Sequence, residues 1–543
     1  MGASSSTAQT VSNEQREVES LVASTGAMPM LLNTFSKLKD PQTNTVSLQS
    51  LQQYFYLNYK NTDCEAPSSI PISFPVLLDH LGASVVDLFY ITEKKEGISW
   101  VEFLRGYLKC CGRMPASLAL NLLLKVFSTT CAKAGLPLKL EFESIDDVDC
   151  KIGGSLLAAD VVMLLWVCWT MLWDSKTSTS LKGKGNLCLP DVSHLVLSAV
   201  ISCVEDVSGL NLWDCDISAL DVQIPAGKFL SWALTTVPCL TGCFTQFVHA
   251  RLQSSASLEQ DKSEPSTSSL GEISPREACN AYLLTLGRAW AISLNLRGTP
   301  SAEILKPYLP SDDIGAFENL LYRSSLNGRG LNRFWSNIEG YHGPLLLLVL
   351  ATSGDAHEDS TGDRKWIIGA LTQQGFENRD LFYGSSGSLY AICPVFHAFS
   401  PLGKDKNFVY SHLHPTSRVY EPHPKPVGIA FGGTIGNERI FIDEDFARIT
   451  VRHHAGDKTY KHGSLFPSQG FLPVEASILE VEVWGLGGKT AKEVQTSYKR
   501  REELFIEQRR KVDLKTFASW EDSPEKMMMD MMSDPNVVRR EDR

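Results

Sequence analysis

The pattern of apolar residues changes near the middle of this 543-residue chain, and that change limits the folds open to it. Residues 14–252 contain short apolar runs at helical spacing, broken by Pro, Gly, Ser and Asp. Residues 253–275 are rich in Ser, Glu and Pro with almost no large apolar groups, which predicts a flexible linker that could be phosphorylated. From residue 303 the chain changes character: a helical opening over residues 304–325, which includes Leu320–Arg323, gives way to short apolar runs that alternate with glycine-rich turns, as β-strands do. We therefore predict an α+β protein.

The same pattern divides the chain into six parts, and its length leaves room for roughly three or four domains. A flexible N-terminus precedes the helical region and its linker; a connecting helix, a strand-rich domain and a C-terminal helix with its tail follow. Their predicted bounds are 1–13, 14–252, 253–275, 276–302, 303–488 and 489–543. Near the end of the helical region, the predicted core positions are Phe229, Trp232 and Leu240.

The composition is that of a soluble globular protein, with 43% hydrophobic and 21% charged residues and a formal net charge of -11. This acidic balance argues against non-specific binding to nucleic acid, so we expect no nucleic-acid partner. The 13 cysteines include no CxxC pair, and the chain starts with no secretory signal. That usage is typical of reduced thiols in the cytoplasm, and we predict no disulfide.

One apolar segment, Leu156 to Trp173, has the length of a short membrane span and Asp160 as its single charge. Eighteen residues is the lower limit for crossing a bilayer, and flanking Lys and Arg are sparse. We therefore expect a buried helix and no transmembrane segment.

The first six residues, MGASSS, match the pattern M-G-x-x-x-[ST] and predict N-myristoylation of Gly2. The alternative is an ordinary disordered, Ser-rich N-terminus. A single myristoyl chain binds membranes with an association constant of only about 10⁴ M⁻¹, so stable anchoring needs a second attachment. Arg16 is the one basic residue among the first 36, so that attachment has to come from elsewhere. We predict peripheral, reversible membrane association in a complex with a partner.

Two stretches of the helical region are similar to EF-hands with degraded calcium loops. In residues 88–108, alignment on the exit helix places Ile91, Glu93 and Lys95 at positions one, three and five of the loop. Isoleucine cannot bind calcium and lysine repels it, so we predict helix pairs retained for packing. Calcium sensing is an alternative function. The earlier candidate, with Val46 at loop position eight, offers the ligands Lys39, Pro41, Thr43 and Ser50.

Five separated blocks in the second half resemble, in order and spacing, the TLDc domain shared by oxidation-resistance proteins. The resemblance covers about residues 303 to 488. It implies a β-sandwich of two antiparallel sheets flanked by helices. Independently, GPLLLLVLA suits a buried central strand. The run ILEVEVWG alternates as a half-buried strand does, with Ile478, Glu480 and Glu482 on one side against Leu479, Val481 and Val483 on the other. The blocks are LLYRSSLNGRGLNRFWSNIEGYHGPLLLLVLA, LFYGSSGSLYAICPVF, NFVYSH, VGIAFGGTIGNERIFIDEDF and ILEVEVWGLG.

The resemblance implies a non-enzymatic adaptor that binds the vacuolar proton pump, the V-ATPase, and contributes to oxidative-stress protection. With the Gly2 signal and the EF-hand-like half, the chain is similar to myristoylated family members linked to mTOR signalling on lysosomes. We therefore expect it at the lysosome or vacuole. The signature and partner-binding candidates are Gly340, Gly343, Pro344, Tyr383, Gly384, Gly432, Gly433, Asp443, Glu444, Asp445, Glu482, Trp484 and Gly485.

The alternative is an enzyme with an unrecognised active site in the TLDc domain, but no motif for one is found. YGSSGS fails as a nucleophile elbow because Ser388 replaces the final glycine, and FGGTIG lacks the lysine of a phosphate loop. His412 and His414 could share a strand face and hold a metal, yet Pro415 interrupts that strand. We predict no catalytic residue, metal, cofactor or small-molecule substrate. The other clustered histidines are His453, His454 and His462.

Three consecutive acids, Asp443, Glu444 and Asp445, follow the strand-like run RIFI. On a strand the first and third share a face and the second does not, which makes a poor metal site. We expect them to end the strand, pair with Arg448 or Arg452, or contact a partner.

The tail from residue 489 predicts a long helix that binds a partner. Two basic clusters, at 499–501 and 509–511, also match a bipartite nuclear signal, which makes the nucleus a weaker alternative location. The methionine-rich run at 526–534 would suit an adaptable binding surface or a frayed end. The imperfect apolar stripe of the helix consists of Val494, Tyr498, Leu504, Phe505, Val512 and Phe517.

Overall fold

The computed structural model describes most of the chain, with the backbone alone described at 512–521. The described residues are 13–57, 71, 73–90, 97–136, 138–143, 151–177, 187–207, 209–254, 282–309, 318–353, 364–413, 424–467, 469–521, 526 and 528. Several predictions concern positions outside them. These positions are Gly2, the calcium-loop residues Ile91, Glu93 and Lys95, linker residues 255–275, His414 and most of 526–534.

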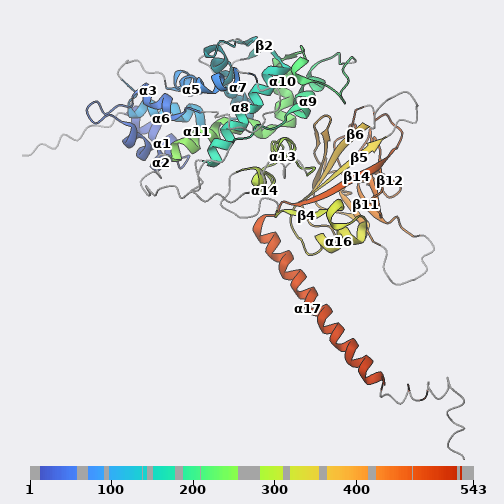
Figure 1. Cartoon of the computed structure of the whole chain (residues 1–543). Coiled ribbons are helices and arrows are strands. Elements are labelled where there is room, and N and C mark those ends of the chain that lie inside the picture. The colour runs from blue at the N-terminus through green and yellow to red at the C-terminus, as the bar shows by residue number, and fades with distance from the viewer. Residues whose placement is uncertain are drawn as a thin grey trace, which may run out of the picture.

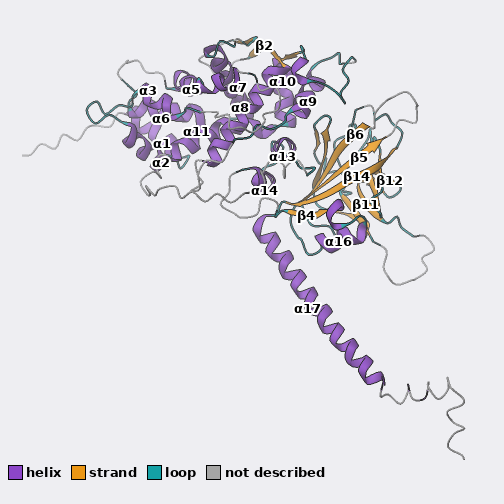
Figure 2. Cartoon of the chain, in the orientation of Figure 1, coloured by secondary structure: helices purple, strands orange, loops and turns teal. Residues whose placement is uncertain are grey.

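The first half is helical, as predicted, and lies to one side of the strands (Figure 2). Its predicted core residues Phe229, Trp232 and Leu240 are buried. Three short strands form a small antiparallel sheet: β1 (Leu140–Phe142), β2 (Ile152–Leu157) and β3 (Gln223–Pro225). The helices are α1 (Asn13–Ala23), α2 (Met28–Leu38), α3 (Leu48–Tyr54), α4 (Ser73–Asp79), α5 (Leu81–Phe89), α6 (Trp100–Cys111), α7 (Ala116–Lys133), α8 (Ala158–Thr177), α9 (Ser193–Cys203), η1 (Ile217–Ala219), α10 (Ala226–Thr236), η2 (Pro238–Gly242) and α11 (Cys243–Ser254).

Helix α8 contains most of the apolar segment that resembles a membrane span. Its indole donors are satisfied inside the fold, because Trp166 Nε1 donates to Pro190 O and Trp169 Nε1 to Cys188 O, each at 2.9 Å. Length and composition alone would let α8 cross a membrane, and would let the bent pair α6 and α7 do so as one span. However, 78% of the apolar window of α8 is buried inside the molecule.

The two EF-hand-like helix pairs, α2–α3 and α5–α6, are joined through their loops. Val46 and Ile98, the two residues aligned at loop position eight, exchange backbone hydrogen bonds of 2.9 and 2.8 Å. Glu102, aligned at position twelve, instead caps α6 by accepting the Ser99 N–H at 2.7 Å. At the first loop, Lys39 Nζ donates to Asn44 Oδ1. Both loops therefore pack two helix pairs together with local contacts.

A connecting segment joins the helical half to the sheet, and it is broken where one helix was predicted. Within the described part of 276–302, α13 (Leu286–Ser293) ends before α14 (Thr299–Leu305), which a 3-10 turn, η3 (Lys306–Tyr308), extends. Gly298, at φ 68°, separates the two helices. In Figure 1 this segment lies between the helical half and the strands.

Within the described residues, the strand-rich domain is one antiparallel sheet of eleven strands. Its order is β7-β10-β11-β12-β13-β14-β5-β6-β8-β9, with β4 paired to β14. The two layers expected of a sandwich are thus parts of a single curled sheet. Two helices, α15 (Ser324–Asn327) and α16 (Leu331–Ile338), accompany it. The strands are β4 (Leu320–Arg323), β5 (Leu345–Ser353), β6 (Arg364–Thr372), β7 (Arg379–Tyr383), β8 (Gly387–Cys393), β9 (His397–Phe399), β10 (Val409–His412), β11 (Gly428–Thr434), β12 (Asn437–Asp443), β13 (Arg448–Val451) and β14 (Val474–Gly485).

Strand β5 shows why the run GPLLLLVLA is apolar at every position. Leu345, Leu347 and Val349 pack into the core inside the curled sheet. Leu346 and Leu348 point the other way and join the core of the helical half. Because alternate residues on a strand face opposite sides, a strand covered on both sides needs apolar residues throughout. The predicted buried central strand is confirmed.

Two local predictions were wrong. Leu320–Arg323 was assigned to a helical opening, but it forms β4, because its backbone pairs with the end of β14. Glu482 was placed on the solvent-facing side of a half-buried strand, but its side chain is fully buried. A bulge at Leu479 shifts the alternation, and the connecting segment covers that face.

The last element is α17 (Gly488–Glu521), which confirms the predicted C-terminal helix. It starts where β14 ends and projects away from both halves of the molecule (Figure 1). Its length follows from a sequence without Gly or Pro between residues 490 and 520.

Candidate functional site

The base of α17 sits on the glycines that the sequence marked as a signature. A Cβ on Gly340 would lie 2.5 Å from the Tyr498 ring, and one on Gly343 would lie 3.0 Å from the Ala491 Cβ. A Cβ on Gly485 would meet the Tyr341 ring at 2.7 Å. Gly340 and Gly343 therefore provide the space in which the first turns of the helix pack, and Gly485 provides space for the Tyr341 ring beside them.

Hydrogen bonds fix this base in place. Gln495 Nε2 donates to Asn337 O at 2.9 Å and to Glu339 O at 3.3 Å. Tyr498 Oη donates to Glu339 Oε1 at 2.9 Å, and Lys499 Nζ to Asn337 O at 3.0 Å. The predicted basic cluster 499–501 thus begins with a lysine already bound within the chain.

Beyond Lys499 the helix leaves the domain, and every side chain from Arg500 to Lys511 is exposed. Three adjacent apolar residues lie in this stretch: Leu504, Phe505 and Ile506, exposed by 51%, 64% and 47%. At 1.5 Å per residue, the 22 residues from 500 to 521 extend for about 33 Å. Ile506 is absent from the predicted stripe, because a stripe assumes one buried face and this helix has none here.

Four further signature residues shape turns of the sheet. Gly384, Gly432 and Gly433 all have positive φ, and a Cβ on Gly433 would lie 2.2 Å from Asn437 O. Tyr383 is buried at the end of β7, where its hydroxyl accepts the Glu377 N–H at 2.8 Å. Burial raises the pKa of Tyr383 to about 12. These positions support the fold.

The three acids of the RIFIDEDF run form the turn between β12 and β13. Asp443 ends β12; its Oδ1 accepts the Ala447 N–H at 2.8 Å and its Oδ2 lies 3.9 Å from Arg448 Nε. Glu444 and Asp445 are exposed, and the Glu444 backbone carbonyl accepts the Leu331 N–H at 2.7 Å. The acids shape a turn, and two of them face solvent.

Glu482 and Trp484 lie where the sheet meets the connecting segment. The Glu482 carboxylate accepts the backbone N–H groups of Leu283 at 2.9 Å and Leu284 at 3.3 Å, and the Trp484 Nε1–H at 3.0 Å. Arg323 Nε lies 3.5 Å from its Oε1. Because both side chains are buried within the chain, they are not available to a partner, contrary to their selection as partner-binding candidates.

Electrostatics at this junction follow from burial. Burial raises the pKa of the Glu482 carboxyl, although its hydrogen bonds and Arg323 oppose the shift. A second contact places His194 of α9 against the sheet, where its backbone carbonyl accepts the Phe396 N–H at 3.0 Å. Burial lowers the pKa of His194 to about 4. The protonation of both side chains, Glu482 and His194, is therefore coupled to folding.

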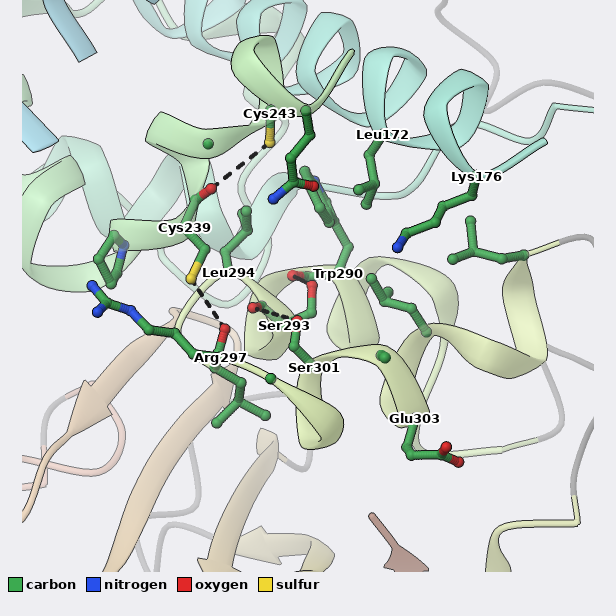
Figure 3. Close-up of a pocket in the computed structure, with 18 of the residues that line it drawn as sticks. Leu172, Lys176, Cys239, Cys243, Trp290, Ser293, Leu294, Arg297, Ser301 and Glu303 are labelled. Carbon is green, nitrogen blue, oxygen red and sulfur yellow. Dashed lines mark hydrogen bonds between the residues drawn. The ribbon is translucent and has the colours of Figure 1, made fainter. Parts of the chain in front are cut away.

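A pocket of about 820 Å³ lies between α8, η2, α11, α13 and α14 (Figure 3). Trp290 and several leucines supply its apolar wall, and Lys176 extends into it from α8. Cys239 Sγ donates to Leu296 O at 3.0 Å, and burial raises the pKa of this thiol. A protonated thiol is a poor nucleophile, and no histidine is among the described residues that line the pocket.

No metal site is found in the part of the chain that the structure describes. That part contains no group of three His, Cys, Asp or Glu side chains able to hold an ion. His412 ends β10, and the His453 ring stacks on Phe471 at 4.9 Å.

Residues 297–487 match the family described as the TLDc domain, so the chain contains a TLDc domain. It is also distantly similar to the "Restriction of telomere capping protein 5" of Kluyveromyces lactis, with 22% identity over 252 residues. The match covers 39% of this chain and 44% of that relative, so the chain spans less than half the length of the relative it matches.

Proposed function

We propose that this protein is a non-enzymatic, membrane-recruited adaptor that binds the V-ATPase through its TLDc domain and α17. It would act at the lysosome or vacuole and contribute to signalling there or to oxidative-stress protection. The supporting observation is α17, which is seated on the TLDc signature glycines and then exposes Leu504, Phe505 and Ile506 beyond the domain.

The exposed half of α17 favours a protein partner. Three consecutive residues on a helix span about 200° around its axis, so a partner must enclose the helix or contact more than one side. Fully burying the three apolar side chains would contribute about 1.5–3 kcal/mol each. The total, about 5–9 kcal/mol, is comparable to the cost of association, about 4–15 kcal/mol, so these residues would be the centre of a larger interface.

The enzyme alternative has weaker support. Among its described lining residues, the pocket between α8 and α14 presents the protonated thiol of Cys239 and no histidine. An adaptor requires only surfaces, and α17 supplies one.

Affinity purification from solubilised membranes tests the proposal. We expect the full chain to recover V-ATPase subunits, and the variant Leu504→Ser/Phe505→Ser/Ile506→Ser to lose them at an unchanged melting temperature. Leu326→Ser, which changes a leucine that is 69% exposed on α15, is the matched control. Equal recovery by the triple variant, or no pump subunits with the full chain, would contradict the proposal.

Membrane recruitment has a separate test. Gly2→Ala removes the acylation site and should shift the protein to the soluble fraction. Unchanged membrane association would refute the proposed role of the lipid.

A further inference from the structure

We propose that one end of the TLDc sheet is a docking surface for an anionic lipid bilayer. This loop end consists of residues 400–407, 434–437, 452–467 and 469–473. Its components are apolar tips that protrude, lysines beside them and a buried ion pair that holds the loops.

Four exposed apolar side chains gather at the loop end. Phe471 and Leu472 are 77% and 81% exposed, the highest values of any large apolar side chain among the described residues. Ile435, at the tip of the β11–β12 hairpin, is 41% exposed, and Leu402 is 39% exposed. Isolated exposed apolar residues are normal, but an adjacent aromatic and aliphatic pair on one loop indicates an interaction site.

Backbone hydrogen bonds, a shared pocket and a ring stack place these segments side by side. The Leu402 N–H donates to Thr459 O at 2.8 Å, and the Lys461 N–H to Ser400 O at 2.9 Å, so 400–402 runs along 459–461. The hairpin and the 454–459 loop share the lining of a pocket of about 370 Å³. Stacking of the Phe471 ring on His453 joins the last segment.

A buried arginine makes this end rigid. Arg439 is fully buried; its Nη1 donates to Asp457 Oδ2 at 2.9 Å and to Lys461 O at 2.7 Å. Its Nη2 donates to Gly463 O at 2.8 Å, and its guanidinium lies 4.7 Å from the Phe399 ring centroid. Rigid loops lose little conformational entropy when their tips are bound.

The charge of the loop end is opposite to that of the whole chain. Residues 400–407, 434–437 and 452–473 contain five Lys and Arg against two Asp, while the chain carries -11. Of the two acids, Asp457 is buried against Arg439. The exposed lysines are Lys404, Lys406, Lys458 and Lys461.

An anionic bilayer fits this combination. Aromatic and aliphatic tips enter the headgroup region, and lysines beside them bind acidic lipids. The loop end precedes β14 and α17 follows it, so they lie at opposite ends of a 12-residue strand about 40 Å long. One end can therefore contact a membrane while the other holds a protein. This reading rests on the proposed membrane recruitment, and it supplies the second attachment that a single acyl chain needs.

Vesicle sedimentation of the full chain carrying Gly2→Ala tests the surface without the acyl group. We expect binding to vesicles of phosphatidylcholine with phosphatidylserine, and none to phosphatidylcholine alone. Phe471→Ser/Leu472→Ser should weaken binding about tenfold. Lys458→Gln/Lys461→Gln should weaken it about fivefold per lysine.

The matched control is Leu326→Ser/Leu381→Ser, which replaces two leucines that are 69% and 60% exposed outside the loop end. It should bind as well as its parent. Because all these side chains are exposed, melting temperatures should not change. Equal binding by Phe471→Ser/Leu472→Ser, or no binding of the parent to the acidic vesicles, overturns the proposal.

The assay contains no partner protein, so its result is independent of pump binding by α17. Loss of V-ATPase recovery in Phe471→Ser/Leu472→Ser, without vesicle binding by the parent, would show that the loop end contacts protein instead.

Discussion

Replacing Glu482 by alanine should destabilise the junction between the connecting segment and the sheet by about 4 kcal/mol. The carboxylate accepts three hydrogen bonds of 2.9 to 3.3 Å, and its side chain is fully buried. Each buried donor left without a partner costs about 1–3 kcal/mol. In the variant, Arg323 loses its ion pair with Glu482 but retains the one with Glu480, whose Oε2 lies 3.4 Å from Arg323 Nε. The lost ion pair therefore adds little to the cost.

Glu482→Gln separates the contribution of the side chain's shape from that of its charge, because glutamine has nearly the same shape and is neutral. The amide retains one acceptor oxygen but directs an NH₂ group toward donors that the carboxylate satisfied. We therefore expect a smaller loss, about 1–2 kcal/mol.

Urea unfolding of the full chain, followed by tryptophan fluorescence and far-ultraviolet circular dichroism, measures these losses. Glu475→Ala is the control, because Glu475 is exposed on the same strand and should change the free energy of unfolding by less than about 0.5 kcal/mol. If Glu482→Ala costs no more than this control, the junction does not depend on the carboxylate.

Two further predictions concern the seat of α17 and the second contact between the halves. Gly340→Ala should cost about 2–3 kcal/mol, because φ is 79° and the new Cβ meets the Tyr498 ring. In a Tyr498→Ala background the ring is gone, so Gly340→Ala should cost less, and only the backbone strain should remain. If Gly340→Ala lowers the free energy of unfolding equally with and without the Tyr498 ring, the steric explanation is refuted. Burial lowers the His194 pKa from 6.5 to about 4, so the folded protein favours the neutral imidazole. The free energy of unfolding should therefore be highest above pH 6.5 and should fall by up to about 3 kcal/mol as the pH is lowered toward 4. His194→Gln should flatten that part of the stability profile, and a difference from wild type that does not vary with pH would contradict the assignment.

Local patterns identified the elements that depend on periodicity. The run GPLLLLVLA predicted β5, and a long stretch without Gly or Pro predicted α17. The sequence also identified the signature glycines, but it did not reveal that they leave space for α17. The Tyr498 ring that fills the space beside Gly340 lies 158 residues further along the chain.

The errors arose where distant segments decide burial. Leu320–Arg323 has no distinctive strand pattern, and pairing with β14 makes it β4. Glu482 looked like a solvent-facing acid because its partners, Leu283 and Leu284, lie 199 and 198 residues away. Neither relation is visible in a local window.

The sequence by itself determined the helical first half, the central strand, the C-terminal helix and the resemblance to TLDc domains, since these follow from residue spacing along the backbone. The tertiary structure decided which polar groups were buried and which exposed residues met. It brought Leu402, Ile435 and Phe471 to one end of the sheet and placed α17 at the other. The physical reason is that periodicity acts over a few residues, whereas desolvation and surface chemistry depend on contacts between segments far apart in the chain.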